Sequence, residues 1–363
     1  MRLYLKLLHT TVVTASASGS RSYPVTFLGT HKHADGSSWA GRGFAGGAND
    51  PSGSMGRHSK HELHSTQRTK GAELGELVDT PPSLLANIIA VASDVDGTLA
   101  SPEVTVTRRT SDAIKAILDS GLMFFPATGK TRAGMYKTMG KDLATMMKER
   151  NLPGVFNQGL VVYAGAGDDV IFERLLDKDV VALVSTFCEE QGMSLIGYSG
   201  DRIVCSKNDA QTDKVAGCME IAPEAVGSLT EAMDAGLRIH KLIIMATTEA
   251  IDRVRPDVER LVGEGATVTQ ALSDMLEVLP PGASKGNGVA KLLEHLGVDP
   301  ARVMAMGDAE NDVGMLELAG VGVCVANASP MAKAAADFMV PSNAEEGAAV
   351  AMEHVLRSKS SEL

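Results

Sequence analysis

The sequence predicts an α/β fold: a doubly wound parallel sheet with a smaller α+β module inserted into it. Three observations predict this fold. Short apolar runs alternate with amphipathic helical stretches near both ends of the folded region, which is the pattern of parallel strands joined by crossover helices. Between them, residues 171–279 mix hairpin-like strands with helices. Finally, 363 residues with 44% hydrophobic content are enough for about two domains of roughly 100–200 residues each.

The first half of the main domain is expected at residues 86–170. Four short apolar runs predict its strands: residues 88–92, 122–127, 154–157 and 160–163. A helical pattern covers residues 113–118. We expect this helix to end at Gly121, because glycine is common just after a helix C-terminus. A second helical pattern covers residues 135–139. The alternation predicts parallel pairing with helices on both faces of the sheet.

The inserted module and the return to the main domain follow from the same patterns. Within residues 171–279 and at their edge, strands are expected at residues 170–176, 194–198, 202–206, 240–246 and 276–279, and helices at 180–190 and 250–263. The parallel pattern resumes over residues 280–358, with helices at 285–296, 313–318, 330–336 and 345–357, and strands at 303–307, 321–325 and 338–341.

The N-terminal segment has a different composition. Residues 1–61 contain seven basic and two acidic side chains, a net charge of +5, whereas the whole chain carries −11 and the remainder therefore −16. The segment is rich in Gly, Ser and His, and its few apolar residues cannot offset the entropy of ordering. We therefore predict that residues 1–85 form a disordered extension. A basic, Ser-rich and acid-poor N-terminus is typical of a plastid or mitochondrial transit peptide; a cytoplasmic protein with an untargeted tail, a misassigned start and a secretory signal are the alternatives.

The bulk composition excludes several classes of protein. A net charge of −11 and a pI near 5.3 argue against a nucleic-acid partner, which a basic patch would indicate. No apolar run reaches the ~18 residues that span a bilayer, so no membrane segment is expected. The four cysteines form no CxxC pair, so neither a zinc site nor a redox dithiol is indicated. The oligomeric state cannot be derived from the sequence.

Two carboxylates follow the first predicted strand, in the stretch DVDGT at residues 94–98. Asp94 and Asp96 can divide a phosphoryl-transfer reaction between them. One attacks phosphorus and becomes an acyl phosphate, and the other protonates the leaving oxygen and then activates water. Because paired carboxylates repel a phosphate, a cation must intervene, and Mg²⁺ typically binds one or two carboxylates together with substrate phosphate.

Further polar residues are expected at the same edge of the sheet. Asp308 ends a predicted strand, and Asp312 follows four residues later in GDAEND at residues 307–312. Both can reach one ion. Lys285 begins a predicted helix and can neutralise phosphate, and Thr128 can donate hydrogen bonds to a phosphoryl oxygen. Ligands of open parallel sheets bind outside the carboxyl ends of the strands, so these groups are expected to converge there.

These motifs, in this order, resemble the haloacid dehalogenase superfamily of hydrolases. The closest branch is the Cof type (type IIB), in which an α+β cap is inserted into a Rossmann-like core. The resemblance implies that Asp94 is the nucleophile and Asp96 the general acid/base, and that Asp94, Asp308, Asp312 and the Asp96 carbonyl surround Mg²⁺. The phosphate-binding set that it implies is Thr128, Gly129, Lys130, Lys285 and Asn311, with Asn311 orienting Lys285 or an acidic ligand.

The chain departs from that branch in two places. The usual Thr-Gly-Arg is Thr128-Gly129-Lys130 here, and lysine keeps the charge but loses the bidentate fork. The usual Asn-Gly after the third strand is Asn157-Gln158-Gly159 here, which changes the substrate side of the cleft.

The predicted function is therefore Mg²⁺-dependent hydrolysis of a phosphorylated small metabolite, such as a sugar phosphate, through an aspartyl-phosphate. A phosphosugar mutase of the same superfamily and a non-catalytic phospho-ligand binding protein are the alternatives. Substrate choice is assigned to the cap, whose candidate residues are Tyr198, Arg202, Lys207 and Lys241.

Overall fold

The computed structural model describes residues 74–80 and 82–360. The predictions for residues 1–73 lie outside these described residues. We expected the folded core to start near residue 86, and this boundary is wrong: strand β1 (Gly75–Glu76) already pairs with the core sheet. Leu77, in the turn that follows, is buried in the main hydrophobic core. Its burial against the core fixes this short segment at the edge of the sheet.

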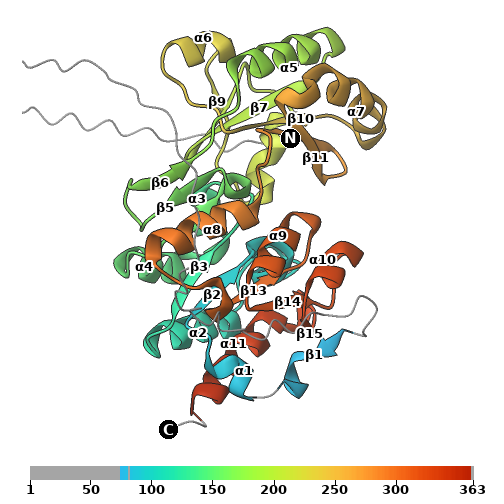
Figure 1. Ribbon diagram of the computed structural model, residues 1–363. Helices are drawn as coiled ribbons and strands as arrows, with labels where there is room; N and C mark the ends of the chain where they lie inside the picture. Colours follow the sequence, from blue (N-terminus) through green and yellow to red (C-terminus); the bar gives the residue numbers. More distant parts are fainter. Residues whose placement is uncertain (1–73, 81, 361–363) are drawn as a thin grey trace, which may run out of the picture. The chain divides into compact units, whose positions relative to one another are not determined.

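The main sheet has six strands in the order β1-β15-β14-β13-β2-β3, and all neighbouring pairs are parallel (Figure 1). The strands after β1 are β2 (Ala90–Ser93), β3 (Met123–Pro126), β13 (Val303–Gly307), β14 (Val321–Val325) and β15 (Phe338–Val340). Their residues are almost entirely buried, as expected when helices cover both faces of a parallel sheet. The predicted α/β class and parallel core are confirmed.

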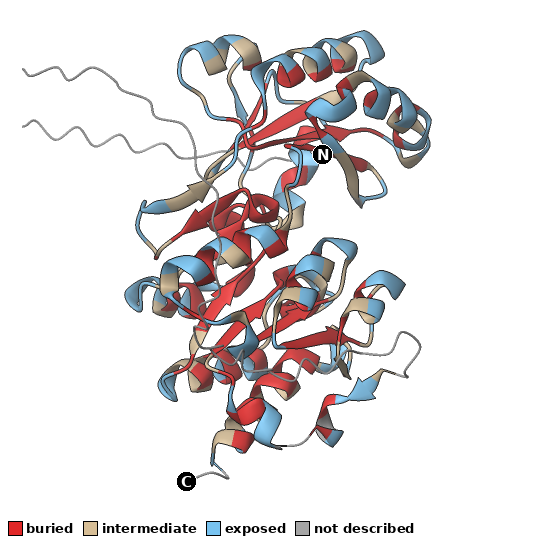
Figure 2. Cartoon of the chain, viewed as in Figure 1, coloured by how far each residue is buried: buried red, intermediate tan, exposed pale blue. Residues whose placement is uncertain are grey.

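Helices flank this sheet (Figure 1). On the main domain they are α1 (Pro82–Ala86), α2 (Arg108–Asp119), α3 (Arg132–Met139), α4 (Lys141–Glu149), α8 (Lys285–Leu296), α9 (Val313–Leu318), α10 (Pro330–Ala335) and α11 (Gly347–Ser360). Helix α11 packs against α1 and α2, while α8 packs against α9. Buried residues lie on the strands and on the sheet-facing sides of the helices (Figure 2).

A three-stranded antiparallel sheet corrects part of the predicted alternation. It consists of β4 (Gly154–Phe156), β5 (Val161–Tyr163) and β6 (Val170–Glu173). We expected the first two as parallel strands of the core and the third in the inserted module. The connection from β4 to β5, residues 157–160, is too short for the crossover that parallel pairing requires, so the strands pair as hairpins.

The inserted module contains its own six-stranded sheet, in the order β11-β12-β10-β7-β8-β9. The strands are β7 (Ser194–Ser199), β8 (Arg202–Cys205), β9 (Glu224–Ala225), β10 (Lys241–Met245), β11 (Thr267–Leu272) and β12 (Met275–Leu279). Helices α5 (Lys178–Gln191), α6 (Leu229–Asp234) and α7 (Thr248–Val262) accompany them (Figure 1). Strands β9 and β11 and helix α6 were not predicted.

The two faces of this sheet carry different sets of side chains. Leu242, Ile244 and Leu276 belong to the apolar cluster that includes α5 and α7. Ile243 and Met245 alternate with them and belong to a smaller cluster on the other face. Since successive strand residues point to opposite faces, Lys241 shares the second face.

Candidate active site

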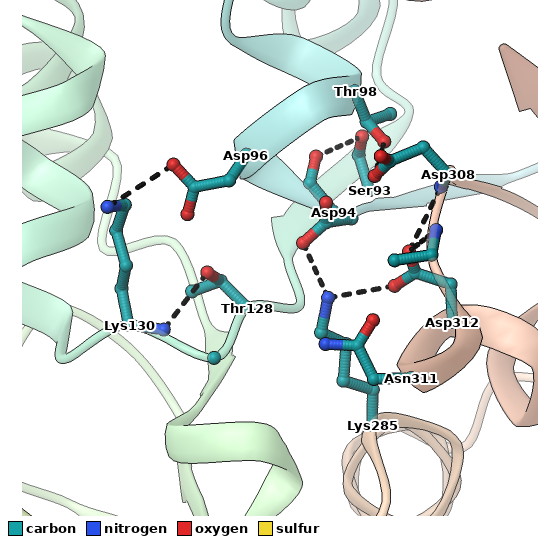
Figure 3. Close-up of polar contacts among 12 residues, drawn as sticks. Ser93, Asp94, Asp96, Thr98, Thr128, Lys130, Lys285, Asp308, Asn311 and Asp312 are labelled. Atoms are coloured by element: carbon teal, nitrogen blue, oxygen red, sulfur yellow. Dashed lines mark hydrogen bonds and ion pairs between the residues drawn. The ribbon is translucent and has the colours of Figure 1, made fainter. Parts of the chain in front are cut away.

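The predicted polar residues follow three neighbouring strands of the core sheet (Figure 3). Asp94 comes directly after β2, Thr128 lies just beyond β3, and Asp308 comes directly after β13. Because β13, β2 and β3 are adjacent and parallel, these carboxyl ends meet at one edge of the sheet. The turn after Asp94 uses Gly97 at φ +81°, and a Cβ there would lie 2.4 Å from a carboxylate oxygen of Asp308. Only glycine allows this close approach.

Lys285 joins the two central carboxylates. Its ammonium donates to Asp94 Oδ1 at 2.6 Å and to Asp312 Oδ1 at 2.8 Å (Figure 3). All three side chains are buried. Although burial alone would lower it, the carboxylates of Asp312 and Asp94 raise the pKa of Lys285. The lysine is therefore held in its charged form beside Asp94.

The loop after β13 fixes the two later carboxylates. Asp312 Oδ2 accepts hydrogen bonds from the backbone N–H groups of Asp308 and Ala309, both at 3.0 Å. Thr98 donates its hydroxyl to Asp308 Oδ1 at 3.1 Å. These bonds orient both side chains toward Asp94.

The carboxylate cluster fits a divalent cation. Among the described residues, Asp94, Asp308 and Asp312 each offer an oxygen within 4.8 Å of those of the other two. Burial, and then the Asp312 carboxylate, raise the pKa of Asp308, although Lys285 opposes the shift. Burial raises the pKa of Asp94 well above its usual range, and Lys285 only partly opposes this. One lysine therefore does not balance three acidic groups, and an oxygen-ligated cation such as Mg²⁺ would.

Asp96 points away from this cluster, toward Lys130 (Figure 3). Its carboxylate is 45% exposed and lies 3.2 Å from the Lys130 ammonium. The Thr128 hydroxyl accepts from the Lys130 backbone N–H at 3.2 Å, and the Lys130 side chain also donates to the Cys218 carbonyl of the inserted module. Lys130, the departure from the expected arginine, therefore bridges Asp96 and the inserted module.

Asn311 does not have the contact that we expected for it. Its side-chain amide donates to Gln158 Oε1 at 2.9 Å, rather than orienting Lys285 or an acidic ligand. Gln158 in turn contacts Glu277 of β12. Glu277 was not among the predicted site residues. It is the lone acidic residue in the apolar stretch of β12, and this pattern was a usable signal because buried charges require partners.

The four candidates for substrate selection have different surroundings. Lys241 is buried, pairs with Glu277 at 2.6 Å and donates to the Gly129 carbonyl at 3.1 Å. Its ammonium lies 4.3 Å from the centre of the Tyr198 ring. Arg202 is exposed and pairs with Glu224, and Lys207 is exposed. The hydrogen bond from Lys241 to Gly129 therefore links the cap to the predicted phosphate-binding turn.

Comparison with known proteins identifies the class. A family described as haloacid dehalogenase-like hydrolase matches residues 91–352. A haloacid dehalogenase-like hydrolase from Bacteroides thetaiotaomicron has the same fold, with a TM-score of 0.67 and 24% identity over 74% of this chain and 99% of that chain. A subclass IIB sugar phosphatase of that superfamily superposes with a TM-score of 0.61 at 24% identity, covering 73% and 98% of the two chains. This chain belongs to the haloacid dehalogenase-like hydrolases, and its fold is that of the subclass with an inserted α+β cap.

Two curated relatives extend the comparison. The HMP-PP phosphatase of Cronobacter sakazakii is 28% identical over 66% of this chain and 84% of its own length. The chloroplastic endoribonuclease YBEY of Arabidopsis thaliana is 38% identical over 71% of this chain. The match spans only 45% of that relative's length.

Within residues 74–80 and 82–360, the structure contains no helix with the length and hydropathy of a membrane span.

Proposed function

We propose that this chain is a Mg²⁺-dependent phosphatase that hydrolyses a phosphorylated small metabolite, with sugar phosphates as the favoured class. One observation carries the proposal: Asp94 is buried at a strand end, Lys285 lies 2.6 Å from it, and two further carboxylates lie within reach of the same cation. Phosphoryl transfer depends mainly on positioning and charge neutralisation, and this arrangement supports both.

The residues divide the reaction between them. A carboxylate oxygen of Asp94 forms a bond to phosphorus as the bond to the substrate oxygen breaks, and Asp96 gives that oxygen its proton. Water then attacks the phosphorus and loses a proton to Asp96, which releases inorganic phosphate and restores Asp94. Lys285 and Thr128 stabilise the phosphoryl oxygens. When bound, Mg²⁺ would be held by Asp94, Asp308, Asp312 and the Asp96 carbonyl, and would neutralise phosphate charge.

A panel of phosphorylated metabolites tests this function by release of inorganic phosphate. We expect activity with Mg²⁺, loss of activity with EDTA, and a fall of at least ~10³-fold in Asp94→Asn. Asp112→Asn, which changes an exposed carboxylate on α2, is the matched control and should retain activity. Activity that survives both EDTA and Asp94→Asn would refute the mechanism, and isomerised sugar phosphate without free phosphate would indicate a mutase.

We also propose that the part of residues 1–85 that precedes strand β1 directs the chain to an organelle. The basic, acid-poor composition of the segment and the chloroplastic name of one relative support a plastid. A fluorescent protein fused after residue 85 tests this, and a diffuse cytosolic signal would contradict it.

A further inference from the structure

We propose that Gln158 is a positioning residue that couples two equilibria. One is the contact of the cap sheet with the core, which we call the seated cap, and the other is the conformation of the metal-binding loop at residues 307–312. The inference rests on the proposed function for the identity of that loop. It deepens that function by identifying a residue through which the position of the cap affects the site.

The backbone of Gln158 is fixed to the predicted phosphate-binding turn. Its N–H donates to the Thr128 carbonyl at 3.1 Å, and the preceding Asn157 N–H donates to the Lys130 carbonyl at 3.0 Å. Both residues have positive φ, +51° for Asn157 and +63° for Gln158. This conformation costs roughly 1–2 kcal/mol per non-glycine residue. The chain nevertheless adopts this conformation at both residues, and the Gln158 side chain lies buried against Gly129.

The two ends of the Gln158 amide contact two different parts of the molecule. Nε2 donates to Glu277 Oε2 of cap strand β12 at 3.2 Å, and Oε1 accepts from Asn311 of the metal-binding loop at 2.9 Å. An ionised carboxylate can only accept hydrogen bonds, so the amide nitrogen must face Glu277 and the oxygen is left for Asn311. The side chain at residue 158 therefore needs a hydrogen-bond donor and an acceptor on the same terminal group, as an amide has.

The cap partner of Gln158 belongs to a buried ion pair. Lys241 and Glu277 have side chains only 2% and 3% exposed and lie 2.6 Å apart. A buried pair offsets its desolvation only when further hydrogen bonds satisfy the remaining donors and acceptors. Two of those bonds cross to the core: Lys241 to the Gly129 carbonyl and Glu277 to Gln158. Both exist only while the cap sheet rests on the turn, so they favour the seated cap.

The core partner of Gln158 lies beside a predicted metal ligand. Asn311 immediately precedes Asp312, whose carboxylate contacts Lys285 and two backbone N–H groups of the loop. A seated cap thus holds the loop in the arrangement that gathers the three carboxylates. Because coupling between two equilibria is reciprocal, a cation bound at the loop must also stabilise the seated cap.

Amide hydrogen exchange of the full chain tests this coupling without requiring turnover. In the wild type, we expect Mg²⁺ to slow exchange in β10 and β12. Gln158→Met conserves volume but removes both polar atoms; it should speed this exchange several-fold without Mg²⁺, weaken the apparent Mg²⁺ affinity about 5–10-fold and abolish the Mg²⁺-dependent slowing. Asn311→Ala should leave the Mg²⁺-free exchange unchanged and still abolish the slowing.

The matched control is Gln270→Met, the same chemical change in β11. Gln270 donates to the Ser273 carbonyl within the cap, so this variant should behave as the wild type. If Gln158→Met keeps wild-type Mg²⁺ affinity and Mg²⁺-dependent protection, the proposal is overturned, even if the variant melts at a lower temperature. Phosphate release by the wild type is measured separately: its absence refutes the phosphatase and not the coupling.

Discussion

At the scale of single residues, charge determines the behaviour of the site. Three carboxylates gather around one lysine at the end of β2 and β13. Burial, together with the neighbouring Asp312 carboxylate, disfavours the ionised forms of Asp94 and Asp308 and raises their pKa values. In the absence of a cation the site is therefore a source of instability within the core.

Removing one of these carboxylates should relieve that instability. When the folded pKa of an acid lies above its unfolded value, ionisation destabilises the fold at every pH above the unfolded pKa. Without Mg²⁺ at pH 7, Asp94→Asn should therefore raise the free energy of unfolding by about 1 kcal/mol, or 2–4 °C in Tm. Thermal unfolding in EDTA measures this, and added Mg²⁺ should stabilise the wild type more than the variant. Asp96→Asn, at an exposed position, should not change the Tm in EDTA; a destabilised Asp94→Asn would contradict the prediction.

A buried histidine should make stability depend on pH. His240 Nδ1 accepts from the Gly200 N–H at 3.0 Å, so the proton lies on Nε2, which donates to Glu173 at 2.8 Å. Burial lowers the pKa of His240 to about 4, although the Tyr198 carbonyl opposes the shift. The unfolded chain binds a proton near pH 6.5 and the folded chain does not, so stability is complete above that pH and falls below it.

Between pH 6.5 and 5 this single group should reduce the free energy of unfolding by about 1–2 kcal/mol. Urea unfolding at several pH values measures the slope. In His240→Gln, the slope over this interval should become flatter; an unchanged slope would assign the pH dependence to other groups.

At the scale of elements, close backbone contacts position the side chains of the candidate site. Helix α8 begins with Lys285, and its next residue, Gly286, faces the backbone of α9. A Cβ on Gly286 would lie 2.6 Å from the carbonyl carbon of Gly314. The approach of these two helices therefore determines where the lysine ammonium can reach.

Gly286→Ala tests this packing. Alanine normally favours a helix over glycine by about 1 kcal/mol, yet here it should destabilise the protein by roughly 2 kcal/mol or more and reduce kcat, because α8 must move away from α9. Gly297→Ala, at the end of the same helix, meets no atom within 4 Å but has φ +64°. It should cost about 1–2 kcal/mol without changing kcat. Chemical denaturation and steady-state kinetics distinguish the two, and wild-type kcat in Gly286→Ala would contradict the prediction.

At the scale of the whole described chain, polar contacts connect the cap to the core. Glu220 of the cap accepts from the backbone N–H and the hydroxyl of Thr131, which caps helix α3. Beside it, the guanidinium of Arg132 contacts Asp201 of the cap, Asp168 in the loop after β5, and two carbonyls of that loop. It also stacks 3.9 Å from the centre of the Tyr163 ring. One side chain thus joins three segments.

Arg132→Lys should loosen this junction although it conserves the charge. Lysine cannot reproduce a planar fork with several partners, so we expect a loss of about 1–3 kcal/mol and faster amide exchange in the turn at residues 199–202. Arg202→Lys makes the same change in an exposed pair with Glu224 and should change stability by less than about 0.5 kcal/mol. Equal effects of the two substitutions would contradict the structural role of Arg132.

The chain by itself determined the class of fold and the likeness to a family, because both depend on local patterns. Strand and helix periodicity predicted α8, β13, α9 and β14 with the same bounds that the structure has. Strand ends followed by carboxylates predicted which edge of the sheet carries Asp94 and Asp308. These features need only sequence-adjacent residues and the parallel pairing rule.

Only the tertiary structure determined which polar side chains from distant parts of the sequence become hydrogen-bond partners. Gln158, Asn311 and Glu277 are far apart in sequence, and their contacts depend on how the cap sheet rests on the core. Periodicity also could not distinguish parallel β4 and β5 from the hairpin that forms, because both patterns are short and buried. Long-range hydrogen bonds and burial depend on packing of whole elements, and local pattern carries no information about the partner that each polar group will meet.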